Sequence, residues 1–141
     1  MTELSLTGGC LCGGVRFELT RPPVAANYCH CTRCQRRTGT AASASARVAP
    51  GTVRVTRGEE LVRSYRPEDG FAKDFCSRCG PALWSRDPDS GEVAGVRFGA
   101  FDSDPGIRPQ WRQFVDYAAG WEPIPDDGLP RHGERPAERA R

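Results

Sequence analysis

The chain has 141 residues, a formal net charge of +2 and 38% hydrophobic residues, so it has room for one domain with a modest core. Its 16 glycines and 12 prolines favour short elements joined by many turns and argue against a helical bundle. No stretch approaches the ~18 apolar residues of a membrane span, and the N-terminus has neither the basic start nor the apolar run of a secretory signal, so we expect a cytoplasmic protein.

The first predicted elements surround a glycine-rich cysteine loop. Residues 8–14 combine glycine with two cysteines, and such a backbone can bend tightly around an ion. Residues 15–19 alternate apolar and polar side chains with period two, which predicts a half-buried strand. We expect residues 27–31 to be extended, and residues 32–38 to form a short helical turn that ends at Gly39.

Further strands are predicted at residues 53–55, 61–65, 71–75 and 92–98, with a weaker candidate at 114–117. The C-x-x-C motif that follows the third of these strands is closed by Gly-Pro, as in a hairpin-like knuckle. From Asp126 onward the composition turns to Pro, Arg, Glu and Gly. We therefore interpret residues 1–125 as a mostly β domain with short helical turns, and residues 126–141 as a loose C-terminal tail.

The cysteines carry the strongest chemical signal in the chain. They occur as C-x-C, C-x-C-x-x-C and C-x-x-C motifs, at Cys10, Cys12, Cys29, Cys31, Cys34, Cys76 and Cys79. An odd number excludes full disulfide pairing, and thiolates two or three residues apart can close on one metal ion. We interpret them as zinc ligands, with disulfides or an iron–sulfur cluster as the alternatives.

The seven cysteines divide naturally into a group of three and a group of four. Cys29, Cys31 and Cys34 are local enough to surround one ion. The remaining four would join the N-terminal strand to the middle of the chain at a closed, structural zinc site made by Cys10, Cys12, Cys76 and Cys79. Such a site can contribute on the order of 10 kcal/mol to folding. Two Zn²⁺ ions bound by seven thiolates would change the formal charge from +2 to −1, which leaves no net basic field to attract nucleic acid.

The three-cysteine group is where we expect function. His30 could close it as an inert site, but alternate side chains of an extended stretch point to opposite faces, so His30 should face away from an ion held by Cys29 and Cys31. Zinc with three thiolates and an open position is a poor activator of water and is suited to holding an incoming thiol as the thiolate. The predicted chemistry is therefore the addition of a thiol to an electrophile, or its reversal.

Candidate substrate-binding residues flank this group. Three arginines that could bind the carboxylates of a glutathione-like thiol, or form a solvated helix face instead, are Arg33, Arg36 and Arg37. Thr38 and Gly39 offer a hydroxyl and a backbone amide nearby, with an ordinary helix stop as the alternative. His30 is a candidate proton shuttle, against the simpler interpretation that it packs or caps.

The chain resembles the glutathione-dependent formaldehyde-activating enzyme (GFA) family at residues 9–18, 29–39 and 75–80. All seven cysteines fall on the ligand positions of that family. The resemblance implies an Mss4-like fold of several small antiparallel sheets held by two Zn²⁺ ions per chain, one structural at the four cysteines and one catalytic at the three. It also implies carbon–sulfur lyase activity, in which glutathione or another low-molecular-weight thiol condenses with formaldehyde or another small aldehyde.

The chain departs from that family near its C-terminus. Many members have a proline, two further residues and then a histidine, whereas this chain has Arg112 after Pro109-Gln-Trp. The alternative function is a non-catalytic two-zinc module that binds a protein or nucleic acid. Because the chain lacks a long basic extension, we predict an enzyme with no nucleic-acid or membrane partner.

Overall fold

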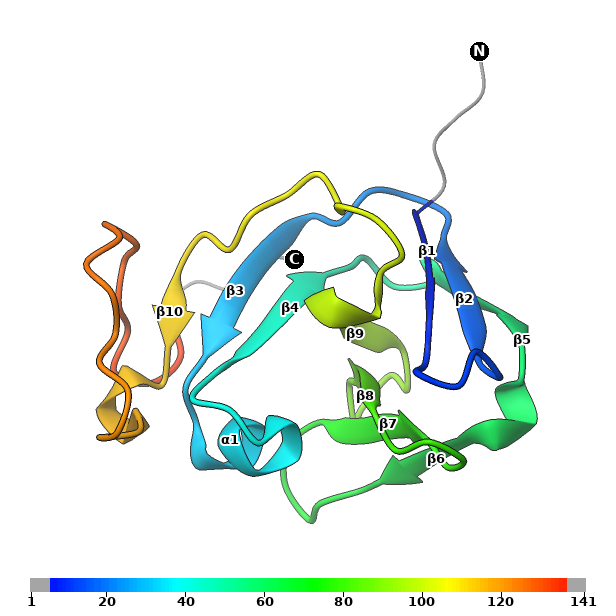
Figure 1. The fold of residues 1–141 in the computed structure, drawn as a ribbon, viewed down its shortest axis with the longest axis horizontal. Helices are drawn as coiled ribbons and strands as arrows, with labels where there is room; N and C mark the ends of the chain where they lie inside the picture. Colours follow the sequence, from blue (N-terminus) through cyan, green and yellow to red (C-terminus); the bar gives the residue numbers. More distant parts are fainter. Residues whose placement is uncertain (1–5, 137–141) are drawn as a thin grey trace.

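The computed structural model describes residues 6–136, which form two β-sheets and one short α-helix (Figure 1). The smaller sheet has the order β1–β2–β5, with β1 at Leu6–Gly9, β2 at Arg16–Leu19 and β5 at Val53–Arg57. The larger sheet has the order β10–β3–β4–β9–β8–β7–β6. Its strands are β3 (Ala25–Cys29), β4 (Ser43–Arg47), β6 (Val62–Tyr65), β7 (Ala72–Cys76), β8 (Ala82–Arg86), β9 (Val93–Arg97) and β10 (Arg112–Gln113). The named strands pair antiparallel, apart from the parallel pair of β10 and β3.

The hydrophobic core lies between the small sheet and the middle of the large one. Phe17 of β2 meets Trp84 of β8 edge to face, with ring centroids 5.4 Å apart. The buried cluster around this pair consists of Val15, Phe17, Leu19, Val48, Cys76, Leu83, Trp84 and Val96. Cys76 is fully buried within it, so the C-x-x-C knuckle is anchored directly to the core.

The opposite face of the central strands is polar, because successive side chains of a strand point to opposite faces. Trp84 pairs with Val96 on the core face, and the next pair along, Ser85 and Gly95, lies on the other face. The same alternation in β4 places Ser45 opposite Arg97 on the polar face. The large sheet therefore separates an apolar core from a polar surface that lines a cavity.

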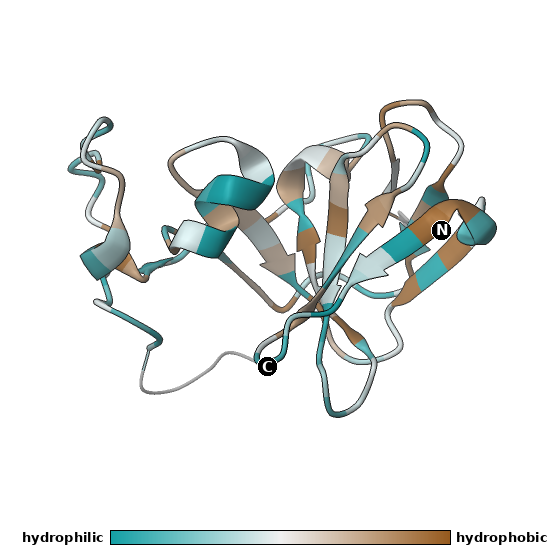
Figure 2. Ribbon diagram, turned by 90° about the horizontal axis from the view of Figure 1, so that it is seen from below, coloured by the Kyte–Doolittle hydropathy of each residue, from teal (hydrophilic) through white to brown (hydrophobic). Residues whose placement is uncertain are grey.

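The helix α1 spans Thr32–Thr38 and is predominantly hydrophilic in the hydropathy view (Figure 2). Cys31 is its N-cap, since the Cys34 amide donates to the Cys31 sulfur at 3.3 Å. Gly39 ends the helix at φ 70°, a conformation that favours glycine, and its amide donates to Gln35 O at 2.8 Å. The predicted helical turn and its stop are confirmed. Within residues 6–136, no helix is long and apolar enough to cross a membrane.

The prediction of a mostly β fold with short helical turns is confirmed. The five main strand predictions coincide with β2, β5, β6, β7 and β9 to within one or two residues at most ends. The candidate strand at 114–117 is wrong, because Phe114 adopts φ 57° and Val115–Tyr117 forms the 3₁₀ helix η3 instead. The amides of residues 114–116 bond to the carbonyls of a returning segment, residues 132–134, rather than to a neighbouring strand. The strands without a sequence prediction are β1, β4, β8 and β10.

Residues 126–136 contain no helix or named strand, yet they are bonded to the domain. The amide of His132 donates to Arg112 O at 2.8 Å, and the amide of Arg112 donates to Pro130 O at 2.9 Å. Tyr117 Oη donates to the Glu134 carboxylate at 2.6 Å. This part of the predicted loose tail thus runs beside β10, while residues 137–141 lie outside the described residues and the boundary after residue 125 stays a prediction.

Candidate metal centres and cavity

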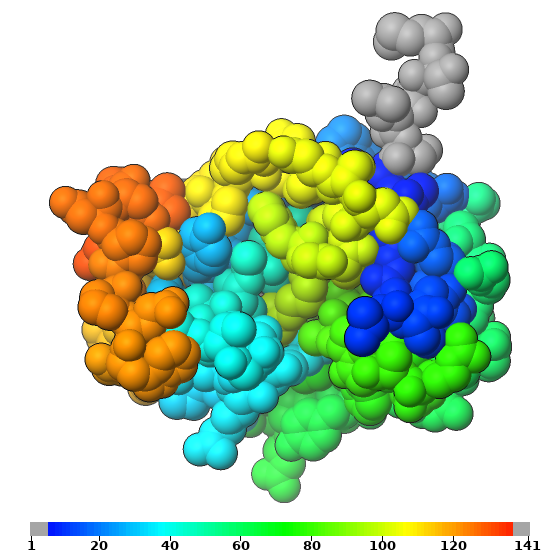
Figure 3. Space-filling view, viewed as in Figure 1, coloured from blue at the N-terminus to red at the C-terminus, as the bar shows by residue number. Residues whose placement is uncertain are grey.

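Four cysteines from two distant parts of the chain form the first cluster. Cys10 and Cys12 lie in the loop after β1, Cys76 ends β7, and Cys79 lies in the following turn. Their sulfurs all lie within 4.8 Å of one another, and those of Cys10 and Cys12 are 3.6 Å apart. Tetrahedral zinc with Zn–S bonds of about 2.3 Å requires sulfurs about 3.8 Å apart, so this donor set fits a closed zinc site. In Figure 3 the N-terminal segment (blue) lies directly against the green segment that carries the knuckle.

Hydrogen-bond donors surround the sulfurs of this four-cysteine cluster. The amides of Gly14 and Val15 donate to the sulfurs of Cys12 and Cys10, at 3.4 and 3.2 Å. The Arg78 guanidinium donates to the Cys12 sulfur at 3.3 Å. The Gly14 amide and then the Arg78 guanidinium lower the pKa of Cys12 to about 6. The loop thus favours the thiolate form that a metal ion requires.

The second cluster consists of Cys29 at the end of β3, Cys31 at the N-cap of α1 and Cys34 inside α1. Their sulfurs also lie within 4.8 Å of one another, and within residues 6–136 no further His, Cys, Asp or Glu ligand atom joins the group. Hydrogen bonds with Cys29 and Cys31 lower the pKa of Cys34, and hydrogen bonds with Cys31 and Cys34 raise the pKa of Cys29. Cys31 is partly exposed and the other two are buried. This cluster could hold a metal ion with one coordination position left to a ligand from outside.

His30 contributes no ligand atom to this group, in agreement with the prediction that it faces away from an ion held by Cys29 and Cys31. It is buried, and Arg112 donates to its Nε2 at 3.1 Å. Because a guanidinium can only donate, Nε2 is the acceptor and Nδ1 carries the proton of the neutral ring. Burial, followed by the charge of Arg112, lowers the pKa of His30. His30 does not line the cavity described next.

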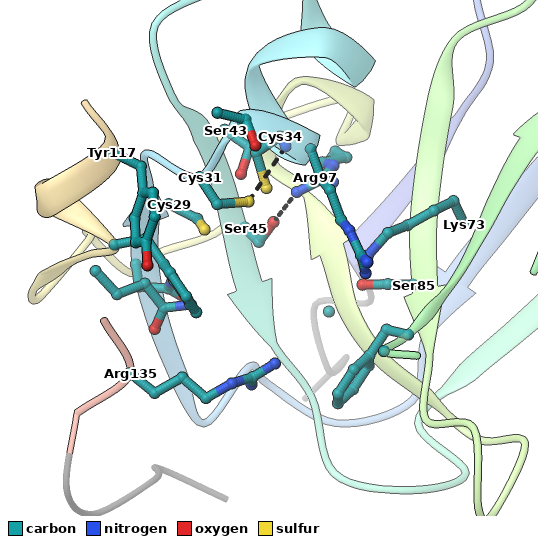
Figure 4. Close-up of a pocket in the computed structure, with 18 of the residues that line it drawn as sticks. Cys29, Cys31, Cys34, Ser43, Ser45, Lys73, Ser85, Arg97, Tyr117 and Arg135 are labelled. Atoms are coloured by element: carbon teal, nitrogen blue, oxygen red, sulfur yellow. Dashed lines mark hydrogen bonds between the residues drawn. The ribbon is translucent and has the colours of Figure 1, made fainter. Parts of the chain in front are cut away.

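A cavity of about 400 Å³ opens in front of the three-cysteine cluster (Figure 4). One wall is the polar face of the large sheet, and the other is formed by α1, the loop around Gly70, and Phe114 and Tyr117 at the two ends of the η3 turn. The cationic side chains on its lining are Arg33, Arg47, Lys73, Arg97 and Arg135. Among the described residues the lining has one acidic side chain, Asp69, which forms an ion pair with Arg33 at 2.7 Å. The cavity therefore has an excess of positive charge.

The three predicted arginines differ in their contacts, and only Arg33 reaches the cavity. Arg33 lies at the rim of the cavity, bound to Asp69. Arg37 donates to the backbone oxygen of Asp74 at 2.7 Å, and burial, followed by the charge of Arg97, lowers its pKa to about 10. Arg36 is exposed and lines, together with Arg33 and Arg37, a separate groove beside Tyr65 and Phe75.

The other two predicted substrate residues are engaged in ending the helix. Thr38 Oγ1 donates to Cys34 O at 2.8 Å, and the Gly39 amide donates to Gln35 O. Neither residue lines the cavity. These bonds satisfy carbonyls of the last helical turn, which is the alternative role expected for both.

Several cavity residues have no counterpart in the sequence predictions. They include Ser43, Ser45, Lys73, Ser85 and Arg97. Two signals could have pointed to them: Lys73 is the only lysine of the chain, and the serines of β4 alternate with alanines at period two. Neither signal predicts a cavity by itself, because only the pairing of the strands shows that these side chains share one face.

Comparisons with known proteins show the family to which the chain belongs. The model of the family described as "Glutathione-dependent formaldehyde-activating enzyme" matches residues 5–117. A protein of Halomonas elongata, named "Putative glutathione-dependent formaldehyde-activating enzyme", is 36% identical over 105 residues, which cover 70% of this chain and 67% of that protein. A crystal structure of a Rhodobacter sphaeroides protein, 27% identical, superposes with a TM-score of 0.52 over 89% of this chain and 98% of that one.

Proposed function

The chain belongs to the glutathione-dependent formaldehyde-activating enzyme family, and from that premise we propose that it is a zinc-dependent carbon–sulfur lyase. It would join a low-molecular-weight thiol to a small aldehyde and cleave the same adduct. The family description and the name of the Halomonas relative support glutathione and formaldehyde as the pair. In that reaction a C–S bond forms, and the hydrogen of the thiol passes to the aldehyde oxygen, which gives S-hydroxymethylglutathione.

One observation carries this proposal: the three-cysteine cluster opens into a cavity of about 400 Å³ and has no fourth protein ligand within residues 6–136. A site with three protein ligands is the arrangement of catalytic zinc, whereas closed four-ligand sites are structural. Zinc bound there would hold a substrate thiol as a nucleophilic thiolate. The cavity walls would enclose the thiol and leave its sulfur beside the open side of the cluster.

The chain's own residues take distinct roles in this proposal. Cys29, Cys31 and Cys34 form the catalytic zinc site, and the four-cysteine cluster forms a structural one, which makes two Zn²⁺ ions per chain. Of the predicted substrate residues, Arg33 is the one at the cavity rim, where its guanidinium could bind a substrate carboxylate in exchange for Asp69. His30 supports the loop between two ligands through its bond to Arg112 rather than by moving a proton.

The test combines metal content with reaction rate. Zinc per chain is measured for the wild type and Cys31→Ser, together with circular dichroism. The exchange between glutathione and S-hydroxymethylglutathione in the presence of formaldehyde is followed by NMR, with protein-free buffer as the baseline because the addition also proceeds spontaneously. We expect two zinc ions in the wild type, one in a folded Cys31→Ser, and acceleration of exchange by the wild type alone.

Two results would contradict the proposal. Exchange at the rate of the buffer for zinc-loaded wild type would exclude this activity. Two zinc ions that leave only when the protein unfolds would show two closed sites, and the function would then be that of a non-catalytic binding module.

A further inference from the structure

Two cations lie on the wall of the cavity that faces the three cysteines. Lys73 extends from β7 and Arg97 from β9; Arg97 lies beside Ser45, close to the cysteines, and Lys73 lies near Ser85 (Figure 4). Both positions belong to the polar face of the large sheet, so strand register rather than a mobile loop places them there. The wall is therefore a built feature of the fold.

These two cations have no acidic partner within residues 6–136. Arg97 donates to Ser45 Oγ at 2.7 Å, and its Nε is buried without a hydrogen-bond partner. Lys73 is half-buried and forms no hydrogen bond or ion pair with the described residues. The one acidic group of the lining, Asp69, is already bound to Arg33 at the rim. A buried donor without a partner is costly, which indicates a place for an acceptor from outside.

The metal site alone does not balance this charge. Zn²⁺ with three thiolates carries one net negative charge, against two cations on the wall. Burial is the main cause that lowers the pKa of Lys73, and the charges of Arg37 and Arg97 lower it further. The Cys34 thiolate acts in the opposite direction and offsets part of this shift. An anion bound between Lys73 and Arg97 would remove the repulsion that these cations exert on each other.

We propose that Lys73 and Arg97, with the hydroxyls of Ser45 and Ser85, form a subsite that binds the carboxylate of the substrate thiol. This inference rests on the proposed function and specifies its substrate class: low-molecular-weight thiols that carry a carboxylate, with the sulfur toward Cys29, Cys31 and Cys34. Lys73 and Arg97 are then specificity residues, and their contribution to neutral thiols is small.

The test uses zinc-loaded full-length protein and two small thiols, one with a carboxylate and one neutral. The dissociation constants of 3-mercaptopropionate and 2-mercaptoethanol are measured by calorimetry, with zinc content checked before and after. We expect the wild type to bind the carboxylate thiol at least tenfold more tightly, because charge-assisted hydrogen bonds are among the strong ones. Lys73→Met and Arg97→Gln should reduce this preference to about twofold or less, while 2-mercaptoethanol binds as in the wild type.

Two control variants test whether the preference depends on positive charge at position 73 and not on the total charge of the protein. Lys73→Arg keeps the cation and should keep the preference, because the subsite requires the positive charge at this position. Arg54→Gln removes an equally charged side chain from the exposed face of β5, where it pairs with Glu18, and should leave both thiols unaffected. Thermal melts of all variants confirm that each is folded.

The outcomes distinguish this inference from the proposed function. If zinc-loaded wild type binds neither thiol, the proposed function fails. If it binds both thiols equally, or if the preference survives in both Lys73→Met and Arg97→Gln, the carboxylate subsite is wrong while thiol binding stands. Loss of the preference in Lys73→Arg would equally overturn the subsite.

Discussion

Arg112 connects three segments that lie far apart in the sequence. Its guanidinium donates to His30 Nε2 at 3.1 Å, forms an ion pair with Asp127 at 2.8 Å and lies 4.3 Å from the centre of the Tyr28 ring. His30 sits between Cys29 and Cys31, so Arg112 holds the ligand loop from the side opposite the sulfurs. The family resemblance expects a histidine at this position, and the arginine supports the loop without joining the metal cluster.

We expect Arg112→Met to destabilise the protein by about 2 kcal/mol. The thioether retains much of the packing but leaves His30 Nε2 without its donor and leaves the Asp127 carboxylate, within residues 6–136, with only the Leu129 amide. Removing one side of a buried polar network costs more than the net contribution of its hydrogen bonds. The cost is moderated because the Asp127 side chain is 31% exposed. Guanidinium denaturation at fixed free zinc measures the free energy of unfolding.

The matched control is Arg108→Met, which removes an arginine from the exposed ion pair with Asp104. Exposed pairs of this kind contribute little, so the loss should stay below about 0.5 kcal/mol. Equal losses in the two variants would mean that Arg112 does not support the ligand loop.

Single residues differ in how far the sequence alone reveals them. The cysteines could be predicted because their ligand groups are marked by short spacings along the chain. Lys73 and Arg97 could not, because in a sequence a basic residue on a strand looks the same whether it faces water or a cavity. Their role depends on the register of β7, β8 and β9, which is a long-range property.

At the scale of elements, β4 shows why some strands escape prediction. Its sequence, Ser-Ala-Ser-Ala-Arg, has none of the large β-branched or aromatic residues that mark a strand. Ser43 and Ser45 line the cavity, and Ala46 lies on the other face opposite Val96, so both faces require small side chains. The residues that make room for a ligand thus remove the hydrophobic alternation on which strand prediction depends.

The turn before the 3₁₀ helix η1 (Glu59–Leu61) packs against the loop that carries Cys10 and Cys12, so its backbone conformation affects metal binding. Gly58 has φ 78°, and a Cβ there would lie 2.0 Å from Gly14 O, whose residue donates its amide to the Cys12 sulfur. We expect Gly58→Ala to cost at least 3 kcal/mol, since about 1 kcal/mol of left-handed strain is joined by a backbone clash. Zinc retention at the four-cysteine cluster should fall as well, measured by competition with a chromogenic chelator.

Gly51→Ala isolates the strain from the clash. Gly51 also has φ 78°, but a Cβ there meets nothing within 4 Å. Its loss of stability should be about 1 kcal/mol or less, with zinc retention unchanged. If Gly58→Ala also lost only about 1 kcal/mol and retained zinc, the loop around Cys12 would have moved to relieve the clash, and the prediction would be wrong.

At the scale of the whole molecule, the two cysteine clusters occupy different positions in the fold. The four-cysteine cluster joins the loop between β1 and β2 to the knuckle between β7 and β8, and Cys76 belongs to the core. The three-cysteine cluster joins only β3 to the start of α1, which are adjacent in the chain. The spacing of the cysteines predicts this division, whereas the order of the seven strands depends on pairings that no local pattern specifies.

This difference predicts unequal effects of one substitution at two sites of similar burial. Cys79 and Cys31 are both partly buried, so Cys→Ser removes the same atom from a similar environment. Cys79→Ser should lower the free energy of unfolding by several kcal/mol, because a metal bridge between distant segments contributes directly to folding. Cys31→Ser should lower it by about 1 kcal/mol, since the segments it joins are already held by the pairing of β3 with β4 and by the cap of α1. Denaturation of both variants with zinc present measures the difference, and equal losses would mean that the three-cysteine cluster is as structural as the other.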